Sequence, residues 1–356
     1  MKTCKKLLSV LLCVVVVLGL CACGAKEEAA PAPQAGAEAT PEAVAPAGDV
    51  IEIQFGFENS LKEPLGQGVE KWAELLDEVS GGTMKIVPYP DSQLGNKTDI
   101  IDSMLLGEPV FTLADGAFYA DYGVPDMGIL FGPFLFDDWD QCWKLIESDW
   151  YAEQSALLEA KGLKLVSSNW MYGARHTLTV KPVNKVEDLA GMKIRVPNNQ
   201  IQSYGFDALG AVSTGMSLGD VYSAMQTKAI DGAENPLATL YGRKLHEVGK
   251  NLILDGHVLN FTTWVCSADW FNGLTEQQQN WLIETGKEAG FFNNEVVAKE
   301  EGNYLQMMKD EGVTVVDPSE EVLEGFRAKA QSFYELGSTF GWSEGLYETV
   351  CEAMGK

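Results

Sequence analysis

The chain contains only four arginines, and any site that needs a fixed planar cation has to use one of them: Arg175, Arg195, Arg243 and Arg327. Arg195 stands near the end of segment 192–196, where apolar residues alternate with Lys193 and Arg195. Ligands bind where strands of α/β sheets end, and a guanidinium can hold a carboxylate through two parallel hydrogen bonds. Arg195 is therefore a candidate carboxylate-binding residue. The alternative is a surface arginine paired with Glu187 or Asp188.

The motifs of covalent and metal-dependent catalysis are incomplete. Ser213 lies in a sequence that lacks the first glycine of the nucleophile elbow, and His246-Glu247 is not followed by the second histidine of a zinc protease helix. Three cysteines lie beyond the amino-terminal segment, an odd number without CxxC spacing, which disfavours a disulfide framework or a metal site: Cys142, Cys266 and Cys351. We expect a ligand carrier without enzymatic activity, cofactor or metal ion.

The amino-acid composition and net charge argue against one class of binding partner. The 356 residues are 46% hydrophobic, which is too apolar for a disordered chain and enough for about two lobes with cores of their own. Lys and Arg total 26 against 51 Asp and Glu, a formal net charge of −25. Because no broad basic face is available to hold a polyanion, this balance argues against nucleic acid binding.

Residues 1–22 have the layout of a secretory signal peptide, with basic residues before an apolar run. The run is shorter than the ~20 residues that span a bilayer. Leu20-Cys21-Ala22-Cys23 resembles a bacterial lipobox, which predicts cleavage before a lipidated Cys23. Residues 23–49, mostly Ala, Pro and Glu, cannot bury enough apolar surface to fold and are expected to form a disordered tether. The alternatives are an uncleaved anchor or ordinary signal cleavage.

The elements that would position Arg195 alternate between strands and helices, which predicts an α/β fold. Predicted strands cover 51–57, 84–88, 163–167, 178–180, 192–196 and 313–316, and predicted helices cover 65–79, 221–229, 275–310 and 319–336. Thr275 and Gln278 form a capping box at the start of the longest helix. At about 1.5 Å per residue this helix would be long enough to cross two lobes. The alternative is two helices broken near Gly286 or Gly290.

A series of motifs within residues 50–340 closely resembles the solute-binding proteins of tripartite ATP-independent periplasmic (TRAP) transporters, the DctP-like family. The motifs occur in the family's order and spacing, which makes the match specific. They are Gln93-Leu94-Gly95, Gly132-Pro133-Phe134-Leu135-Phe136, Gly173-Ala174-Arg175, Lys181-Pro182-Val183, Glu187-Asp188-Leu189-Ala190-Gly191-Met192-Lys193-Ile194-Arg195-Val196-Pro197, Asp220-Val221-Tyr222-Ser223-Ala224-Met225-Gln226 and Asp231-Gly232-Ala233-Glu234-Asn235-Pro236.

This resemblance implies a two-lobed periplasmic-binding-protein-like fold, with type II-like mixed sheets and a long helix spanning both lobes. By this analogy residues 50–172 plus 261–300 form lobe I, and residues 173–260 plus 301–356 form lobe II. We expect hinges between the lobes near 171–173 and 260–262, since closure of the cleft would need both crossover segments to bend.

The resemblance also implies roles for three residues. The family's principal carboxylate-binding arginine falls on Arg195, its second ligand-contacting arginine on Arg175, and a ligand-contacting amide on Asn235. Asn235 would equally suit the N-cap of a helix with Pro236 in its first position. The implied function is capture of a small organic acid in the interlobe cleft and delivery to TRAP membrane permease subunits. Dicarboxylates, sugar acids, keto acids and aromatic acids all fit a carboxylate clamp.

Two further functions stay open at the level of sequence. One is an extracytoplasmic sensory lipoprotein that presents its ligand to a signalling receptor. The other is a lipoprotein hydrolase, which would need a nucleophile and a base that the motifs do not supply. In every case the lipobox and tether predict a protein held by lipid on the outer face of the bacterial cytoplasmic membrane.

Overall fold

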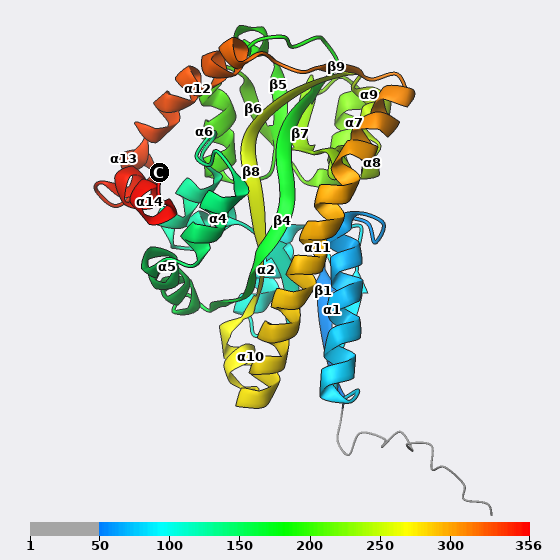
Figure 1. The fold of residues 1–356 in the computed structure, drawn as a ribbon, viewed down its shortest axis with the longest axis vertical. Coiled ribbons are helices and arrows are strands. Elements are labelled where there is room, and N and C mark those ends of the chain that lie inside the picture. Colours follow the sequence, from blue (N-terminus) through cyan, green and yellow to red (C-terminus); the bar gives the residue numbers. More distant parts are fainter. Residues whose placement is uncertain (1–49) are drawn as a thin grey trace, which may run out of the picture. The chain divides into compact units, whose positions relative to one another are not determined.

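Two strands of 17 residues each, β4 (Leu163–Thr179) and β8 (Asn251–Ser267), run antiparallel through the middle of a nine-stranded sheet in the computed structural model (Figure 1). The structure describes residues 50–356. The predicted signal peptide 1–22, the lipidation at Cys23 and the predicted tether 23–49 lie outside the described residues. Within residues 50–356, no helix combines the length and the apolar character needed to cross a membrane.

Parallel strands flank the long pair on both sides. The other strands are β1 (Ile51–Gly56), β2 (Met84–Tyr89), β3 (Val110–Ala114), β5 (Lys193–Val196), β6 (Val212–Gly215), β7 (Gly232–Pro236) and β9 (Thr314–Val316). The order is β2-β1-β3-β8-β4-β7-β5-β6, with β9 beside β8. We call strands β1 to β3 and the helices around them the first half of the molecule. Strands β5 to β7 and the helices around those strands form the second half. This mixed sheet confirms the predicted α/β class.

Helices cover the faces of the sheet in both halves. They are α1 (Pro64–Ser80), α2 (Lys97–Leu105), α3 (Gly116–Asp121), α4 (Trp139–Ile146), α5 (Asp149–Glu159), α6 (Gln200–Ala208), α7 (Val221–Gln226), α8 (Leu237–Gly242), α9 (Leu245–Val248), α10 (Ala268–Asn272), α11 (Glu276–Asp310), α12 (Glu320–Tyr334), α13 (Gly337–Phe340) and α14 (Leu346–Met354). Short 3-10 helices are η1 (Pro125–Phe131), η2 (Val186–Leu189) and η3 (Leu218–Asp220). The helices predicted at 65–79, 275–310 and 319–336 correspond to α1, α11 and α12.

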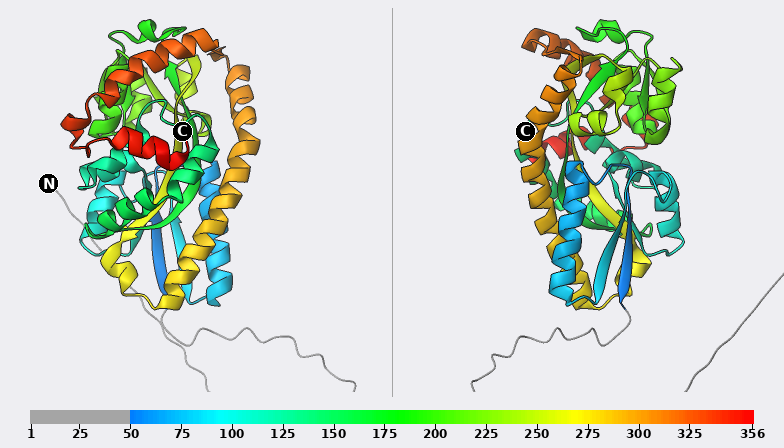
Figure 2. Two further views of the ribbon diagram at one scale, coloured as in Figure 1. Left: turned by 60° about the vertical axis from the view of Figure 1, so that its left-hand side comes forward. Right: turned by 90° about the vertical axis from the view of Figure 1, so that its right-hand side faces the viewer.

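Helix α11 is a single unbroken helix of 35 residues, and the predicted capping box of Thr275 and Gln278 is present at its start. It runs beside both halves (Figure 2). The glycines that could have broken it are places of close packing: a Cβ atom on Gly286 would lie 2.4 Å from the indole of Trp72, and one on Gly290 would lie 2.7 Å from the amide of Asn169. Gly286 and Gly290 therefore admit neighbouring side chains rather than end the helix.

Strand β4 differs from the two short strands predicted at 163–167 and 178–180. It is continuous, but its register with β8 shifts at four places. Each shift interrupts the alternation of buried and exposed residues that identifies a strand in sequence, because an extra residue turns the following side chains to the other face. One shift falls between Met171 and Gly173, opposite Asn260, where the hinges were predicted.

The division into lobe I (50–172 plus 261–300) and lobe II (173–260 plus 301–356) stays a prediction. The carboxyl-terminal helix α14 lies within the segment predicted for lobe II, yet it packs on the first half. Its buried Val350 and Met354 share a cluster with Cys142 and Leu145 of α4, and Lys356 donates to the carbonyl oxygen of Leu135 at 3.0 Å.

Candidate functional site

The three residues predicted to bind ligand lie on neighbouring strands, one on the long strand β4 and two on strands of the second half. Arg175 is in β4, Asn235 is in β7 and Arg195 is in β5. In the β4–β7 ladder, Asn235 stands opposite His176, next to Arg175, and in the β5–β7 ladder Arg195 stands opposite Ala233. All three side chains are at least 97% buried. The sheet therefore gathers two guanidinium groups and an amide, although 60 residues of chain separate the first from the last.

Within the described residues Arg195 has an open guanidinium fork, by which we mean that both terminal nitrogens of its guanidinium group are free to donate hydrogen bonds. Its Nε donates to the carbonyl oxygen of Met216 at 2.9 Å, but no atom of residues 50–356 accepts from either terminal nitrogen. Burial lowers the pKa of this arginine, since removal from water disfavours the charged form. Its predicted alternative partners, Glu187 and Asp188, do not pair with it. A buried cation whose two outer donors are free is suited to a bidentate carboxylate ligand.

Asn235 also presents an unused donor. Its Nδ2 is buried and has no hydrogen-bond partner among the described residues. The alternative structural role, as an N-cap, is not observed: Asn235 is in strand β7, and helix α8 begins at Leu237 with Pro236 at the N-cap. Because a buried donor left unpaired is costly, the free Nδ2 is consistent with a ligand-binding amide.

Unlike Arg195, Arg175 donates hydrogen bonds to other side chains of the protein. Its Nε and Nη2 make a bidentate pair with the Glu234 carboxylate at 2.5 and 2.7 Å, and Nη1 donates to Oδ1 of Asn260 at 3.0 Å. Its guanidinium carbon also lies 5.2 Å from the centroid of the Phe131 ring and 5.7 Å from that of Tyr172. Arg175 is thus held by the protein itself, and direct contact between this residue and a ligand stays a prediction.

The Arg175–Glu234 pair continues into a buried network. Nε2 of His257 lies 3.2 Å from Glu234, and its Nδ1 lies 3.3 Å from Asp255 without the alignment of a hydrogen bond. Burial alone would lower the pKa of His257, but Asp255 and Glu234 raise it to about 9. Burial would likewise raise the pKa of Glu234, but Arg175 and His257 lower it to about 2. His257 is therefore cationic at neutral pH, and Glu234 is anionic.

Three charged residues of the first half were not predicted. Glu58 follows β1, Asp115 follows β3, and Lys97 opens α2, which follows β2. Since these strands are parallel neighbours, their carboxyl ends lie at one edge of the sheet. Asp115 could have been predicted from the sequence, because it is a polar residue directly after the buried strand β3. Lys97 lies two residues beyond the motif Gln93-Leu94-Gly95, but nothing in the sequence marks it as buried.

Arg243, the residue after α8, links the two halves. Its Nη1 lies 3.4 Å from Oδ1 of Asp91, in the loop after β2, and its Nη2 donates to the carbonyl oxygen of Glu58. Asn59 adds a buried hydrogen bond from the first half to Thr239 of α8, at 3.1 Å. These contacts hold the halves together beside the arginines.

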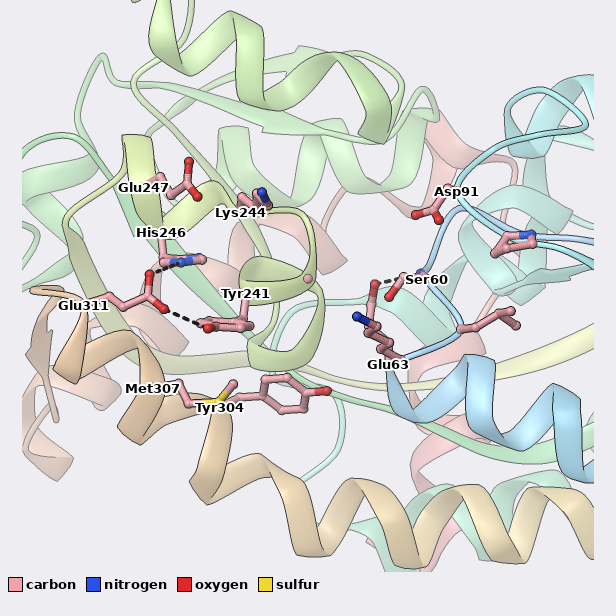
Figure 3. A pocket seen from close by; sticks show the side chains of 14 residues that line it. Ser60, Glu63, Asp91, Tyr241, Lys244, His246, Glu247, Tyr304, Met307 and Glu311 are labelled. Atoms are coloured by element: carbon pink, nitrogen blue, oxygen red, sulfur yellow. Dashed lines mark hydrogen bonds and ion pairs between the residues drawn. The ribbon is translucent and has the colours of Figure 1, made fainter.

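A separate pocket of about 680 Å³ opens to solvent beside this link, between the start of α1, helices α8 and α9, and α11 (Figure 3). Within it, Glu311 accepts a hydrogen bond from the hydroxyl of Tyr241 at 2.7 Å and lies 2.9 Å from Nε2 of His246. Its lining includes none of the three predicted ligand residues. The pocket is therefore distinct from the strand ends that carry the free donors. No cluster of three or more His, Cys, Asp or Glu in residues 50–356 could hold a metal ion.

Known proteins resemble this chain over most of its length. Residues 55–338 match the model of the DctP family, bacterial extracellular solute-binding protein, family 7. The chain is 30% identical to the sialic acid-binding periplasmic protein SiaP of Vibrio cholerae serotype O1, over 81% of this chain and 89% of that protein. It is 31% identical to the 2,3-diketo-L-gulonate-binding periplasmic protein YiaO of Escherichia coli K12, over 74% and 80%.

Two solved structures are similar throughout the described fold. A TRAP periplasmic solute-binding protein from Ochrobacterium anthropi with bound L-fuconate is 36% identical, with a TM-score of 0.82, and the match covers 86% of this chain and 99% of that chain. A TRAP periplasmic solute-binding protein from Actinobacillus succinogenes 130z with bound L-galactonate is 32% identical, with a TM-score of 0.80, over 85% and 99%.

Proposed function

This chain belongs to family 7 of the bacterial extracellular solute-binding proteins, the DctP family, and from that premise we propose that its ligand is an aldonate, a hydroxylated monocarboxylic acid. The membership itself establishes the general role. The relatives are solute-binding proteins of transport systems and not enzymes, so this chain is an extracytoplasmic binding protein of a TRAP transporter. That role replaces the hydrolase and sensory hypotheses.

The free fork of Arg195 is the observation that carries the proposal. A buried arginine with two unused donors, close in the sheet to the unused Nδ2 of Asn235, supports capture of one carboxylate group. Arg175, held by Glu234, would contribute positive potential and its remaining N–H. The aldonate class is further supported by the two similar structures, whose bound ligands are L-fuconate and L-galactonate.

Ligand capture would involve closure of lobe I (50–172 plus 261–300) on lobe II (173–260 plus 301–356). The register shift between Met171 and Gly173 supports this closure, because β4 would bend where its regular pairing with β8 is interrupted. The bridge from Arg243 to Asp91 and Glu58 then suits a closed arrangement. The acid released on opening would pass to the TRAP membrane permease subunits.

A thermal-shift screen tests the ligand class. L-Galactonate and L-fuconate are compared with galactitol, galactose and amino acids on the purified chain. A ligand present at 100 times its dissociation constant adds about 2.7 kcal/mol of stability. We expect a clear rise in melting temperature with the two acids and none with galactitol, which has the same hydroxyl chain without the carboxylate. A shift with galactitol or amino acids and none with the acids would contradict the proposal.

We also propose that Cys23 carries a lipid anchor, so that the protein stays on the outer face of the cytoplasmic membrane. The support is the order of basic residues, apolar run and Leu20-Cys21-Ala22-Cys23. In a bacterial host fed labelled palmitate, the chain should take up label, Cys23→Ser should lose it, and the matched control Cys21→Ser should retain it. Label that persists in Cys23→Ser, or an unlabelled parent chain, would contradict the anchor.

A further inference from the structure

Arg243 is an arginine for which the candidate ligand site provides no role. That site contains two of the other three arginines, and the remaining one, Arg327, pairs with acidic residues of its own helix. Arg243 follows α8 directly, and only 17% of its side chain is exposed. Its guanidinium reaches the first half at two points, Oδ1 of Asp91 and the carbonyl oxygen of Glu58. Arg243 therefore lies in the contact between the two halves.

Thr239 of α8 precedes Arg243 by about one helical turn and makes a second contact between the halves. Its hydroxyl donates to Oε2 of Glu63 at 3.0 Å and accepts from Nδ2 of Asn59 at 3.1 Å. Thr239, Glu63 and Asn59 are each at least 98% buried. Because Asn59 and Glu63 belong to the loop between β1 and α1, this contact also joins α8 to the first half.

The carboxylate of Glu63 depends on this contact for part of its hydrogen bonding. Nδ2 of Asn59 also donates to Oε2, at 2.6 Å, and the N–H of Ser60 donates to Oε1 at 2.9 Å. Burial raises the pKa of Glu63, and its hydrogen bonds and the charge of Arg243 oppose that rise. A buried charge that loses a donor is costly, whereas water can replace the donor once the halves separate. The Thr239 hydroxyl therefore favours the arrangement in which the halves touch.

The same network includes a residue of the predicted hinge. The hydroxyl of Tyr172 lies 3.2 Å from that of Thr239 and 3.3 Å from Nδ2 of Asn59. Tyr172 belongs to stretch 171–173 of β4, where the register with β8 shifts, and its ring centroid lies 5.7 Å from the guanidinium carbon of Arg175. Bending of β4 at this place would disturb the hydrogen bonds between the halves.

We propose that Thr239 and Arg243 form a latch that holds the two halves together around a bound acid and so slows its release. This inference rests on the proposed function, since it assumes that an acid is captured by closure of the halves. The two residues act as positioning residues, through Glu63 and Asp91, rather than by touching the acid. Contacts that form on closure have to break before the acid leaves, so the latch should affect dissociation more than association.

Thr239→Val tests the latch, because it keeps the shape of the side chain and removes the hydroxyl. In stopped-flow measurements with L-galactonate, the dissociation rate should rise about 10-fold, as expected for a lost hydrogen bond to a charged group. The association rate should change less than about 3-fold. Thr239→Ser restores the hydroxyl and should release the acid nearly as slowly as the parent chain. The matched control is Thr285→Val: Thr285 is also buried, but it accepts its hydrogen bond from Trp72 of α1, and its loss should leave both rates unchanged.

Two further variants test the partners of the latch. Arg243→Gln removes the contacts with Asp91 and Glu58, and it should also speed release about 10-fold. Glu63→Gln replaces the charged acceptor with an amide, which depends less on the hydroxyl of Thr239. In that background Thr239→Val should raise the dissociation rate less than about 3-fold. The same rise in both backgrounds would show that the hydroxyl does not act through Glu63 and would overturn the latch.

Hydrogen–deuterium exchange of the ligand-free chain distinguishes failure of the latch from failure of the proposed function. Thr239→Val should speed amide exchange in residues 57–63, which lie in the other half, and Thr285→Val should not. Unchanged exchange in that segment, or parental dissociation rates in both Thr239→Val and Arg243→Gln, would overturn the latch while the carboxylate site stands. If the parent chain does not bind L-galactonate, the aldonate proposal fails. The exchange result then decides the latch alone: faster exchange in residues 57–63 supports it, and unchanged exchange overturns it.

Discussion

Arg195→Ala should weaken the binding of an aldonate such as L-galactonate at least 100-fold. The substitution removes both free donors of the fork and the positive charge that faces the carboxylate. Truncating one partner of a buried charged pair costs about 2 to 5 kcal/mol, and every 1.4 kcal/mol is a factor of ten in affinity. Titration calorimetry measures the change directly. Arg195→Lys keeps the charge but not the bidentate geometry, so its affinity should fall between those of the parent and Arg195→Ala.

The unliganded stability of Arg195→Ala separates lost binding from lost folding. In the described structure Arg195 makes no ion pair, and burial disfavours its charge, so the variant should melt close to the parent chain. The matched control is Arg327→Ala: Arg327 is partly exposed on α12 and pairs with Glu320, and its loss should leave binding unchanged. Near-parental affinity of Arg195→Ala would show that another group holds the carboxylate.

Glu234→Gln should destabilise the fold strongly, and more than any substitution of Arg195 or Lys97. The carboxylate of Glu234 is bound by Arg175 and lies against His257, both buried. Replacing it with an amide leaves two buried cations short of a counter-charge, which typically costs about 3 to 5 kcal/mol. For a chain of this size that corresponds to a melting temperature lower by roughly 10 °C. Thermal unfolding followed by circular dichroism measures the difference.

The pH dependence of the same variant checks the cause. The pKa of Glu234 is lowered to about 2 from its usual value of 4.5, so its stabilisation is complete above pH 4.5 and is lost as pH falls toward 2. The gap between parent and Glu234→Gln should therefore close over that window. Glu320→Gln, which breaks an exposed pair, is the matched control and should cost less than about 1 kcal/mol. A Glu234→Gln variant that melts like this control would refute the buried-pair account.

The sequence was sufficient to predict those features of the protein that depend on a local pattern of residues. Alternating residues identified β1 and β5, the pair Thr275 and Gln278 identified the start of α11, and the ordered motifs identified the family. It was less informative for β4, because register shifts against β8 interrupt the alternation. Those shifts depend on the partner strand, which no local pattern reveals.

Only some residues of the candidate site could be predicted from the sequence. Arg195 could be proposed because it lies near the end of a strand in which apolar and basic residues alternate, and because a family motif includes it. Whether an arginine is free or held depends on residues distant in the chain: Glu234 occupies Arg175 across 59 positions, and nothing in the described residues occupies the fork of Arg195. Lys97 was not predicted because nothing in the sequence indicates that it is buried. Lysines are usually exposed, and its burial arises from α2 packing at the common edge of three strands.

Calorimetric titration of the purified chain with L-galactonate and with galactitol is the most direct test of the central claim, that this protein captures a hydroxylated acid through its carboxylate. The two compounds share the hydroxyl chain, and only the first carries the group that Arg195 would bind. We predict saturable binding of galactonate and none of galactitol at the same concentrations. Equal binding of both, or binding of galactitol alone, would contradict carboxylate capture at Arg195.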